Sequence, residues 1–165
     1  MIEVRPARAG DERALAALDR ATWTTLTSPA PLPPEPDWSF FEEKVQIQDV
    51  LVAVVDGEVA GYVRLARATP LAAGDHVVMI QGLAVDPARQ RHGVGRTLLD
   101  AAAAEARARG ARRLRLRVLA HNEPARRLYD RSGYVVEGVL QGEFCLDGEY
   151  VDDTLMALDL TAGLS

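Results

Sequence analysis

The stretch QRHGVG, residues 90–95, does most to decide how this chain folds, because it joins a strand-like run to an alanine-rich helical segment. The apolar run over residues 76–85 ends at the turn pair Asp86-Pro87, and residues 94–109 repeat their apolar side chains with helical spacing. A Gly-x-Gly at the start of a helix leaves main-chain N–H groups without intrahelical acceptors, and no Cβ keeps a large anion away from them. These donors lie at the positive end of the helix dipole, so the stretch predicts a phosphate-binding loop.

Three kinds of phosphate loop can be compared with this stretch. The dinucleotide fingerprint requires a third glycine where Leu98 stands, and the NTPase loop requires glycine and lysine where Gln90 and Arg96 stand. The remaining pattern, [Gln/Arg]-x-x-Gly-x-[Gly/Ala], resembles the coenzyme A pyrophosphate loop of the GNAT N-acetyltransferase superfamily. On these six residues alone, a tight strand-to-helix connection explains the two glycines equally well.

A second motif decides between these readings. Residues 122–134, NEPARRLYDRSGY, follow the pattern N-x-x-A-x-x-L-Y-x-x-x-G-[Tyr/Phe]. Asn122 is a good helix N-cap, Gly133 suits the left-handed residue that ends a helix, and Tyr129 lies two turns along the face that begins at Asn122. The segment resembles the GNAT segment in which the asparagine contacts the pantetheine arm and the tyrosine hydroxyl faces the coenzyme's sulfur. Two motifs in the right order make the resemblance specific.

The resemblance implies an α/β fold, more closely an α+β mixed sheet, with the GNAT order β-α-α-β-β-β-α-β-α-β-β and splayed central strands. One GNAT acetyltransferase domain is expected over residues 1–165. The expected strands are residues 2–5, 50–55, 58–66, 76–85, 113–119, 135–140 and 149–160, and the expected helices are residues 11–23, 38–48, 94–109 and one that begins after Asn122.

The amino-acid composition limits the classes of protein to which this chain can belong. The 165 residues are 48% apolar and 26% charged, which is typical of one globular domain. No apolar run approaches the roughly 20 residues that span a bilayer, and residues 1–12 lack the apolar core of a signal peptide, so a cytoplasmic protein is expected. The single cysteine, Cys145, excludes an intrachain disulfide, and three scattered histidines do not indicate a zinc site. A net charge of −5 argues against nucleic acid as the main partner.

Charge is distributed unevenly along the chain. Residues 89–131 are strongly basic, and residues 137–159 carry acidic side chains with no basic ones. Both blocks can be solvated faces, or they can place arginines near a polyanionic coenzyme and carboxylates near a cationic amine. The alternation of Arg113, Arg115 and Arg117 predicts a strand with one basic face, which we interpret as a solvated or subunit-facing sheet surface.

The resemblance also implies which residues hold acetyl-CoA. The edge of the strand before the loop would bind the pantetheine amides and polarise the thioester carbonyl, and Tyr129 would act as the general acid that protonates the leaving thiolate. A packed aromatic ring with a satisfied hydroxyl is the other reading of Tyr129. The implied coenzyme contacts are Leu83, Ala84, Val85, Gln90, Arg91, His92, Gly93, Val94, Gly95, Arg96, Asn122, Ala125 and Tyr129.

The general base is less well defined. Several family members carry a glutamate about where Gln81 stands, and a glutamine cannot accept a proton at neutral pH. Glu143 is the first candidate, because its segment resembles acceptor-side sequence in many small-amine GNAT enzymes. A water chain is an equal alternative. The remaining candidates are Asp75, His76, His121 and Asp152.

The expected activity is transfer of an acetyl group from acetyl-CoA to a primary amine of a small molecule by direct attack, without a metal ion. The expected partners are acetyl-CoA and the amine, with no nucleic acid or membrane, and a homodimer is one open arrangement. Two alternatives stay open: a non-catalytic domain that binds acyl-CoA, and a protein or peptide N-acetyltransferase. A small-molecule enzyme predicts a groove closed by residues 24–37 and 143–147.

Overall fold

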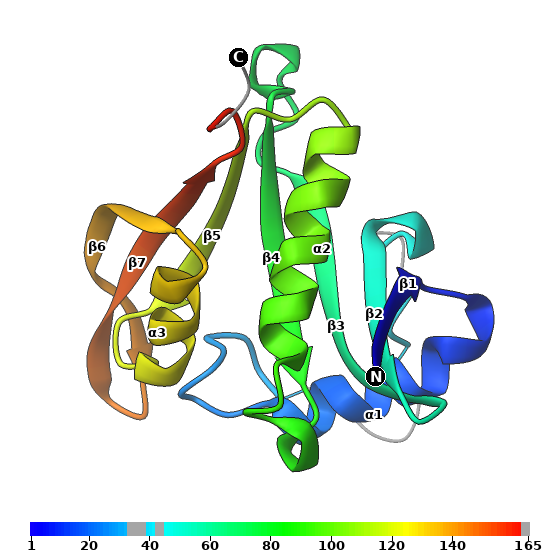
Figure 1. The fold of residues 1–165 in the computed structure, drawn as a ribbon. Helices are drawn as coiled ribbons and strands as arrows, with labels where there is room; N and C mark the ends of the chain where they lie inside the picture. Colours follow the sequence, from blue (N-terminus) through cyan, green and yellow to red (C-terminus); the bar gives the residue numbers. More distant parts are fainter. Residues whose placement is uncertain (33–38, 42–44, 163–165) are drawn as a thin grey trace.

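In the computed structural model, which describes residues 1–32, 39–41 and 45–162, the described strands form one seven-stranded sheet (Figure 1). The strand order is β1-β2-β3-β4-β5-β7-β6, and all neighbours are antiparallel except the parallel pair β4–β5. The predicted mixed sheet is therefore confirmed. The strands are β1 (Ile2–Pro6), β2 (Val50–Val55), β3 (Glu58–Arg67), β4 (Val77–Val85), β5 (Arg113–Leu119), β6 (Val135–Leu146) and β7 (Glu149–Asp159).

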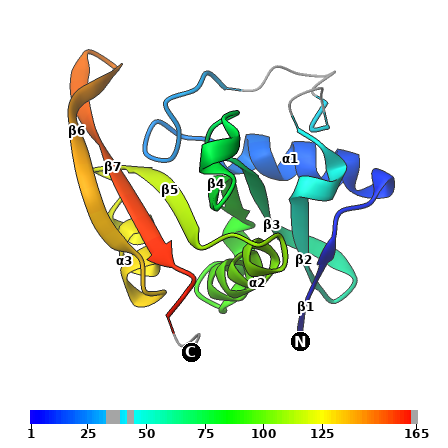
Figure 2. The ribbon, with the colours of Figure 1, turned by 90° about the horizontal axis from the view of Figure 1, so that it is seen from above.

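Helices cover both faces of the sheet (Figure 2). Helix α1 (Glu12–Thr22) packs on one face through Leu15 and Leu18, whereas α2 (Val94–Ala108) and α3 (Glu123–Arg131) lie on the other. The apolar stripe of α2 is buried in the main core, which explains its alanine-rich composition, since small side chains let the helix lie close to the strands. No helix in the described part of the chain is long and apolar enough to cross a membrane.

The second helix expected over residues 38–48 is not an α-helix where the structure describes it. Residues 38 and 42–44 lie outside the described residues, and Ile47–Asp49 forms a single 3₁₀ turn. Gln46 before this turn has an extended backbone, with φ −81° and ψ 137°, which ends any helical run at that point. The described chain therefore passes from α1 to β2 with one α-helix fewer than expected.

Strand β6 is longer than predicted. It was expected to end at residue 140, but it continues to Leu146 across an irregularity between Leu140 and Phe144. There the side chain of Asp152 accepts a hydrogen bond from the Gly142 N–H at 2.8 Å, which holds the bulged segment to β7. Consequently Glu143 lies within β6, beyond the predicted end of this strand at residue 140.

The parallel strands at the centre of the sheet pair over only a short length. Val77, Val78 and Met79 face Arg113, Leu114 and Arg115, and no further pair follows although both strands continue. From Met79 onward β4 and β5 therefore separate, as the predicted splayed strands require. The separation leaves an open main-chain edge on β4 in the interior of the molecule.

Candidate active site

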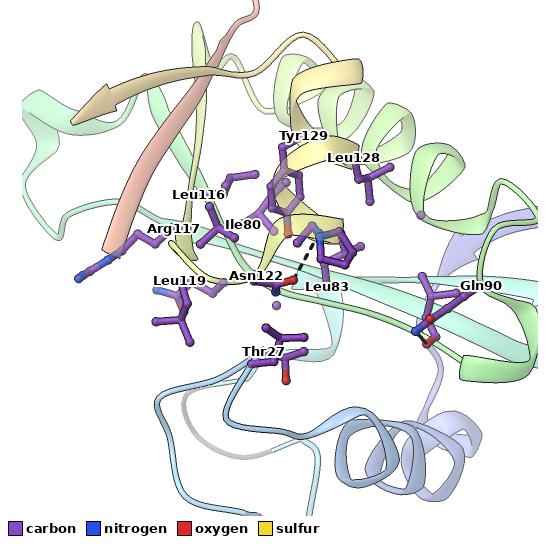
Figure 3. Close-up of a pocket in the computed structure, with 18 of the residues that line it drawn as sticks. Thr27, Ile80, Leu83, Gln90, Leu116, Arg117, Leu119, Asn122, Leu128 and Tyr129 are labelled. Carbon is purple, nitrogen blue, oxygen red and sulfur yellow. Dashed lines mark hydrogen bonds between the residues drawn. The ribbon is translucent and has the colours of Figure 1, made fainter. Parts of the chain in front are cut away.

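A cavity of about 810 Å³ lies where β4 and β5 diverge. Its walls come from both strands, the loop before α2, helix α3 and the segment around Thr27. Figure 3 shows Gln90 at one end of the cavity, Arg117 toward the other, and Asn122 and Tyr129 between them. The two sequence motifs thus meet in one cavity.

The open edge of β4 is shaped by a β-bulge. Gln81 is the extra residue, because Arg64 of β3 faces Gly82 while the next residue of β3 faces Ile80. Further along, the Asp86 N–H donates to a main-chain oxygen of β3 at 2.8 Å. Main-chain groups alternate in direction along a strand, so those of Leu83 and Val85 point to the cavity side.

The loop before α2 presents main-chain donors. Arg91 and Gly93 both have left-handed backbones, with φ 65° and 87°. Thr97 is the first helical residue whose N–H bonds back to the loop, at 3.0 Å from the Gly93 oxygen. Within the described chain, the N–H groups of residues 94–96 have no hydrogen-bond acceptor. They lie at the N-terminus of a fifteen-residue helix, which makes the loop able to bind an oxyanion.

Arg91 and Arg96, the two arginines of this loop, differ in their hydrogen-bond partners. Arg96 is bound internally, since its Nε lies 3.1 Å from Asp100 Oδ1 and its guanidinium donates to the Arg131 oxygen at 2.9 Å. The side chain of Arg91 is exposed and has no polar partner among the described residues. Arg91 is therefore the better placed of the two to meet a phosphate, whereas Arg96 joins α2 to the end of α3.

Helix α3 brings the second motif to the cavity. Asn122 caps the helix, with its Oδ1 accepting from the Ala125 N–H at 3.3 Å, so its amide NH₂ remains available to a ligand. Gly95 lets α3 approach α2, because a Cβ at this position would lie 3.0 Å from a methyl carbon of Leu128. The glycine pair thus has two roles: Gly93 permits the left-handed turn, and Gly95 permits the packing of the helices.

Tyr129 lies on the cavity wall and is almost fully buried. Its ring packs at 5.9 Å, centroid to centroid, against the ring of Tyr134. Burial raises the pKa of the Tyr129 phenol to about 12, because the charged form would lose its hydration. The structure gives its hydroxyl no hydrogen-bond partner among the described residues, so the hydroxyl is protonated and free to donate.

The end of the cavity away from the loop is polar. The Nε of Arg117 donates to the carboxylate of Asp153, which is buried and lines the cavity. The Arg117 Cζ lies 6.0 Å from the centroid of the Phe144 ring, and its terminal nitrogen lies 3.6 Å from Glu143 Oε1. The expectation that Arg117 belongs to a solvated or subunit-facing surface is therefore wrong, since this side chain lines the cavity.

Asp153 is a cavity residue that sequence reasoning missed. Leu119 of β5 faces Asp153 of β7, and Arg117 faces Leu155, so Arg117 and Asp153 are diagonal neighbours on one face of the sheet. The pairing register of two strands far apart in the sequence creates this contact. The acidic block noted in the sequence contains Asp153 but does not distinguish it from its neighbour Asp152.

Most of the predicted coenzyme residues line the cavity, and a few do not. Ala84 and Val94 are buried in the core, and the side chain of His92 is exposed. Glu143 lies beside the cavity through its contact with Arg117, without lining it. Those that line the cavity are Leu83, Val85, Gln90, Arg91, Gly93, Gly95, Arg96, Asn122, Ala125 and Tyr129.

The other candidate bases also lie outside the described lining. Asp75 forms an exposed ion pair, and His76 lines a separate hollow formed with residues at the far ends of β5 and β7. Asp152 is bound to the β6 main chain, and the His121 ring nitrogen lies 3.0 Å from the Thr25 oxygen. Within the described part of the chain, Asp153 is the carboxylate that lines the cavity itself.

The family model described as Acetyltransferase (GNAT) family matches residues 15–134, well over half of the chain. The chain belongs to the GNAT acetyltransferase family. The match contains the loop before α2 and the whole of α3, so the two motifs that form the cavity are the part the family shares.

Solved structures resemble this GNAT acetyltransferase over nearly its full length. The protein smu.2055 from Streptococcus mutans UA159 is 27% identical with a TM-score of 0.84, covering 96% of this chain and 99% of its own. A ribosomal-protein-alanine N-acetyltransferase from Brucella melitensis is 24% identical, with a TM-score of 0.78 and coverage of 95% and 99%. A phosphinothricin acetyltransferase from Sinorhizobium meliloti, in complex with acetyl-CoA, is 18% identical, with a TM-score of 0.81 and coverage of 99% and 90%. Comparison with curated proteins gives no match.

Proposed function

We propose that this GNAT acetyltransferase moves an acetyl group from acetyl-CoA to a primary amine of a small molecule by direct attack. One observation carries the proposal: the cavity joins free N–H groups at the start of α2, the open edge of β4 and the Tyr129 hydroxyl. A diphosphate, an amide-bearing arm and a thioester require these three features in this order. The acetyl-CoA complex of the Sinorhizobium enzyme, which shares the fold, supports the choice of donor.

Each part of the coenzyme has proposed binding residues in the cavity. The diphosphate lies on the N–H groups of residues 94–96, with the exposed guanidinium of Arg91 as a further donor. The pantetheine arm pairs with the main-chain groups of Leu83 and Val85 as an added strand would. The amide NH₂ of Asn122 donates to a carbonyl of the arm, because its oxygen is already bound in the helix cap.

The chemistry follows from the place of Tyr129. The unprotonated amine nitrogen attacks the thioester carbonyl carbon, forming the C–N bond, and the C–S bond breaks with its electron pair staying on sulfur. The sulfur takes a proton from the Tyr129 hydroxyl, and the nitrogen loses its surplus proton to a base or to water. A proton from solvent then restores the Tyr129 phenol, so no proton is gained or lost over the cycle. Since the pKa of Tyr129 is raised to about 12, the phenol holds its proton until the thiolate forms.

Glu143 is the proposed acceptor of the amine proton, directly or through water. It lies at the Arg117 end of the cavity and is half exposed, so water can reach it. Asp153 is less suited to this role, because its carboxylate is buried and already accepts a hydrogen bond from the Arg117 guanidinium. Exchange of Glu143 for glutamine separates this role from a water chain that carries the proton to bulk solvent, since only the role of Glu143 requires the carboxylate.

A small acceptor is favoured by what surrounds the Arg117 end of the cavity. Leu26, Thr27 and Pro29 line the cavity from the segment after α1, and Phe144 lines it from β6. His121 is hydrogen-bonded to the main chain of the same segment, which holds it across the cavity. These walls restrict the room available to a protein terminus, whereas the Brucella enzyme is named for an alanine of a ribosomal protein.

Two measurements on the wild-type protein test the proposal. Calorimetric titration with coenzyme A should give heat of binding, and incubation with acetyl-CoA and a panel of small primary amines should release free thiol in an amine-dependent way. Absence of binding heat would overturn the whole proposal. Binding without amine-dependent release would indicate an acyl-CoA-binding domain, and release with peptides alone would indicate a protein N-acetyltransferase.

A further inference from the structure

Arg117 differs from the other arginines of the cavity in its position. Arg91 and Arg96 belong to the loop before α2, where the coenzyme diphosphate is proposed to bind. Arg117 extends from β5 toward the other end, beyond Tyr129 and Asn122 (Figure 3). The positive charge of Arg117 therefore lies away from the loop before α2, at the end of the cavity that the acceptor would occupy under the proposed function.

The guanidinium of Arg117 is held by two neighbours. Its Nε donates to Asp153, whose side chain is only 3% exposed, and its Cζ lies 6.0 Å from the centre of the Phe144 ring. A carboxylate on the Nε side and an aromatic face together fix the plane of the guanidinium. The terminal nitrogens then remain as a preorganised pair of donors.

Two carboxylates already face this guanidinium, but they leave its terminal nitrogens room for an anionic ligand. Asp153 is covered, and Glu143 approaches the terminal nitrogen only to 3.6 Å, beyond hydrogen-bond range, with 40% of its side chain exposed. A carboxylate from a ligand could accept two parallel N–H bonds and replace this loose contact.

We infer that Arg117 binds an anionic group of the acceptor, so that the acceptor is a small amine that also carries a carboxylate, as an amino acid does. The inference rests on the proposed function, because it names the acceptor class of the same cavity. Asp153 acts as a positioning residue that holds Arg117. The side chains of Leu26, Leu119 and Phe144 leave an apolar surface beside the carboxylate site.

Matched compounds test the inference on the wild-type protein. The common L-amino acids are compared with their α-carboxamides and with the corresponding decarboxylated amines, by thiol release from acetyl-CoA and by calorimetric titration into protein saturated with coenzyme A. We expect at least one amino acid to exceed its amide and its decarboxylated amine by about tenfold or more in kcat/KM, as a site built for a hydrogen-bonding group rejects analogues that lack it.

Variants test whether the preference for a carboxylate depends on Arg117. Arg117→Gln should raise KM for the preferred amino acid by about tenfold or more and leave KM for acetyl-CoA unchanged. Asp153→Asn should also raise KM for the amino acid, because it removes the carboxylate that holds Arg117. Arg115→Gln is the matched control, because Arg115 lies two residues earlier on the same face of β5 and does not line the cavity. An unchanged thermal shift with coenzyme A would show that each variant is folded.

The outcomes separate this inference from the proposed function. Equal turnover of acids, amides and decarboxylated amines would overturn the inference and leave the proposed function standing, as would a preference that survives Arg117→Gln. Failure of every amino acid to bind the coenzyme-saturated protein would also overturn it. Binding of an amino acid that Arg117→Gln abolishes, without any thiol release, would uphold the anion site and overturn the proposed transfer reaction.

Discussion

Burial determines the form in which Tyr129 exists during the reaction. An ordinary phenol has a pKa near 10, whereas that of Tyr129 is raised to about 12 because its charged form would be desolvated. The raised value means that the neutral phenol stabilises the folded state fully below pH 10, and that this contribution is lost as the pH rises through about 12. The phenol of Tyr129, the proposed proton donor, is therefore neutral throughout the neutral and mildly alkaline range.

Tyr129→Phe should lower kcat by more than about tenfold, the loss expected when a general acid is removed, while coenzyme A binding stays the same. Tyr134→Phe is the control, because Tyr134 packs against Tyr129 and its buried hydroxyl has no partner. Steady-state kinetics across pH add a second readout: in the wild type, an alkaline limb due to Tyr129 should lie near pH 12 and not near 10. Wild-type turnover in Tyr129→Phe would return Tyr129 to a packing role.

Gly93→Val should abolish the thermal shift on adding coenzyme A while the protein stays folded. Gly93 has φ 87°, which strains any β-branched residue, yet the nearest atom to an added Cβ is 4.0 Å away, so the change acts on the direction of the N–H groups. Gly110→Val is the matched control, since Gly110 has φ 84° and open space at the opposite end of α2. Both variants should lose stability alike, and only Gly110→Val should keep the shift.

Among the elements, the connection from β1 to α1 depends on one carboxylate. Asp11 is buried and accepts two hydrogen bonds from the Arg5 guanidinium, at 2.8 and 2.9 Å, and one from the Arg8 N–H at 2.7 Å. The hydrogen bonds from Arg5, and then that from the Arg8 main chain, lower the pKa of Asp11, although burial opposes them. The ionised form is therefore what fixes the start of α1.

Asp11→Asn should reduce the free energy of unfolding at pH 7 by about 1–2 kcal/mol, because the charge that binds Arg5 is lost. A lowered pKa gives stability that is present above the unfolded value, near 4, and lost as the pH falls, so the difference from wild type should shrink in acid. Urea unfolding at pH 7 and near pH 3 measures both effects. Asp75→Asn, in an exposed ion pair with Arg67, should change little, and an equal loss there would contradict the argument.

Elements that depend on neighbouring residues in the sequence were easier to predict than elements that depend on contacts between distant residues. Helices α2 and α3 and strand β5 were predicted almost to the residue, because glycine stops, the Asn122 cap and period-two alternation are local signals. The longer β6 depends on the Asp152–Gly142 contact, which is formed only when β7 pairs with it. The position of Arg117 in the cavity wall was missed for the same reason, since Asp153 contacts it across the β5–β7 register.

At the scale of the whole molecule, the coenzyme should bridge the two parts of the sheet that β4 and β5 leave separate. Hydrogen exchange on adding coenzyme A should slow by several-fold at Leu83, Val85 and residues 94–96, because these N–H groups gain acceptors. The N–H groups of β1 and β2 pair with each other at the far edge and serve as the internal control. Slowing that is equal in β1 and β2 would indicate general stabilisation instead of binding along the β4 edge.

The strand order has an evolutionary consequence. Residues 15–134, which match the family model, end immediately before β6, so the β6–β7 hairpin that supplies Phe144 and Asp153 lies beyond the segment that this model matches. This hairpin occupies the outer edge of the sheet and joins the remainder through β5. Lineages could therefore diversify the C-terminal hairpin, or exchange it between homologues, while inheriting the donor-binding machinery unaltered. Chimaeras that graft this hairpin are a direct route to redirecting selectivity.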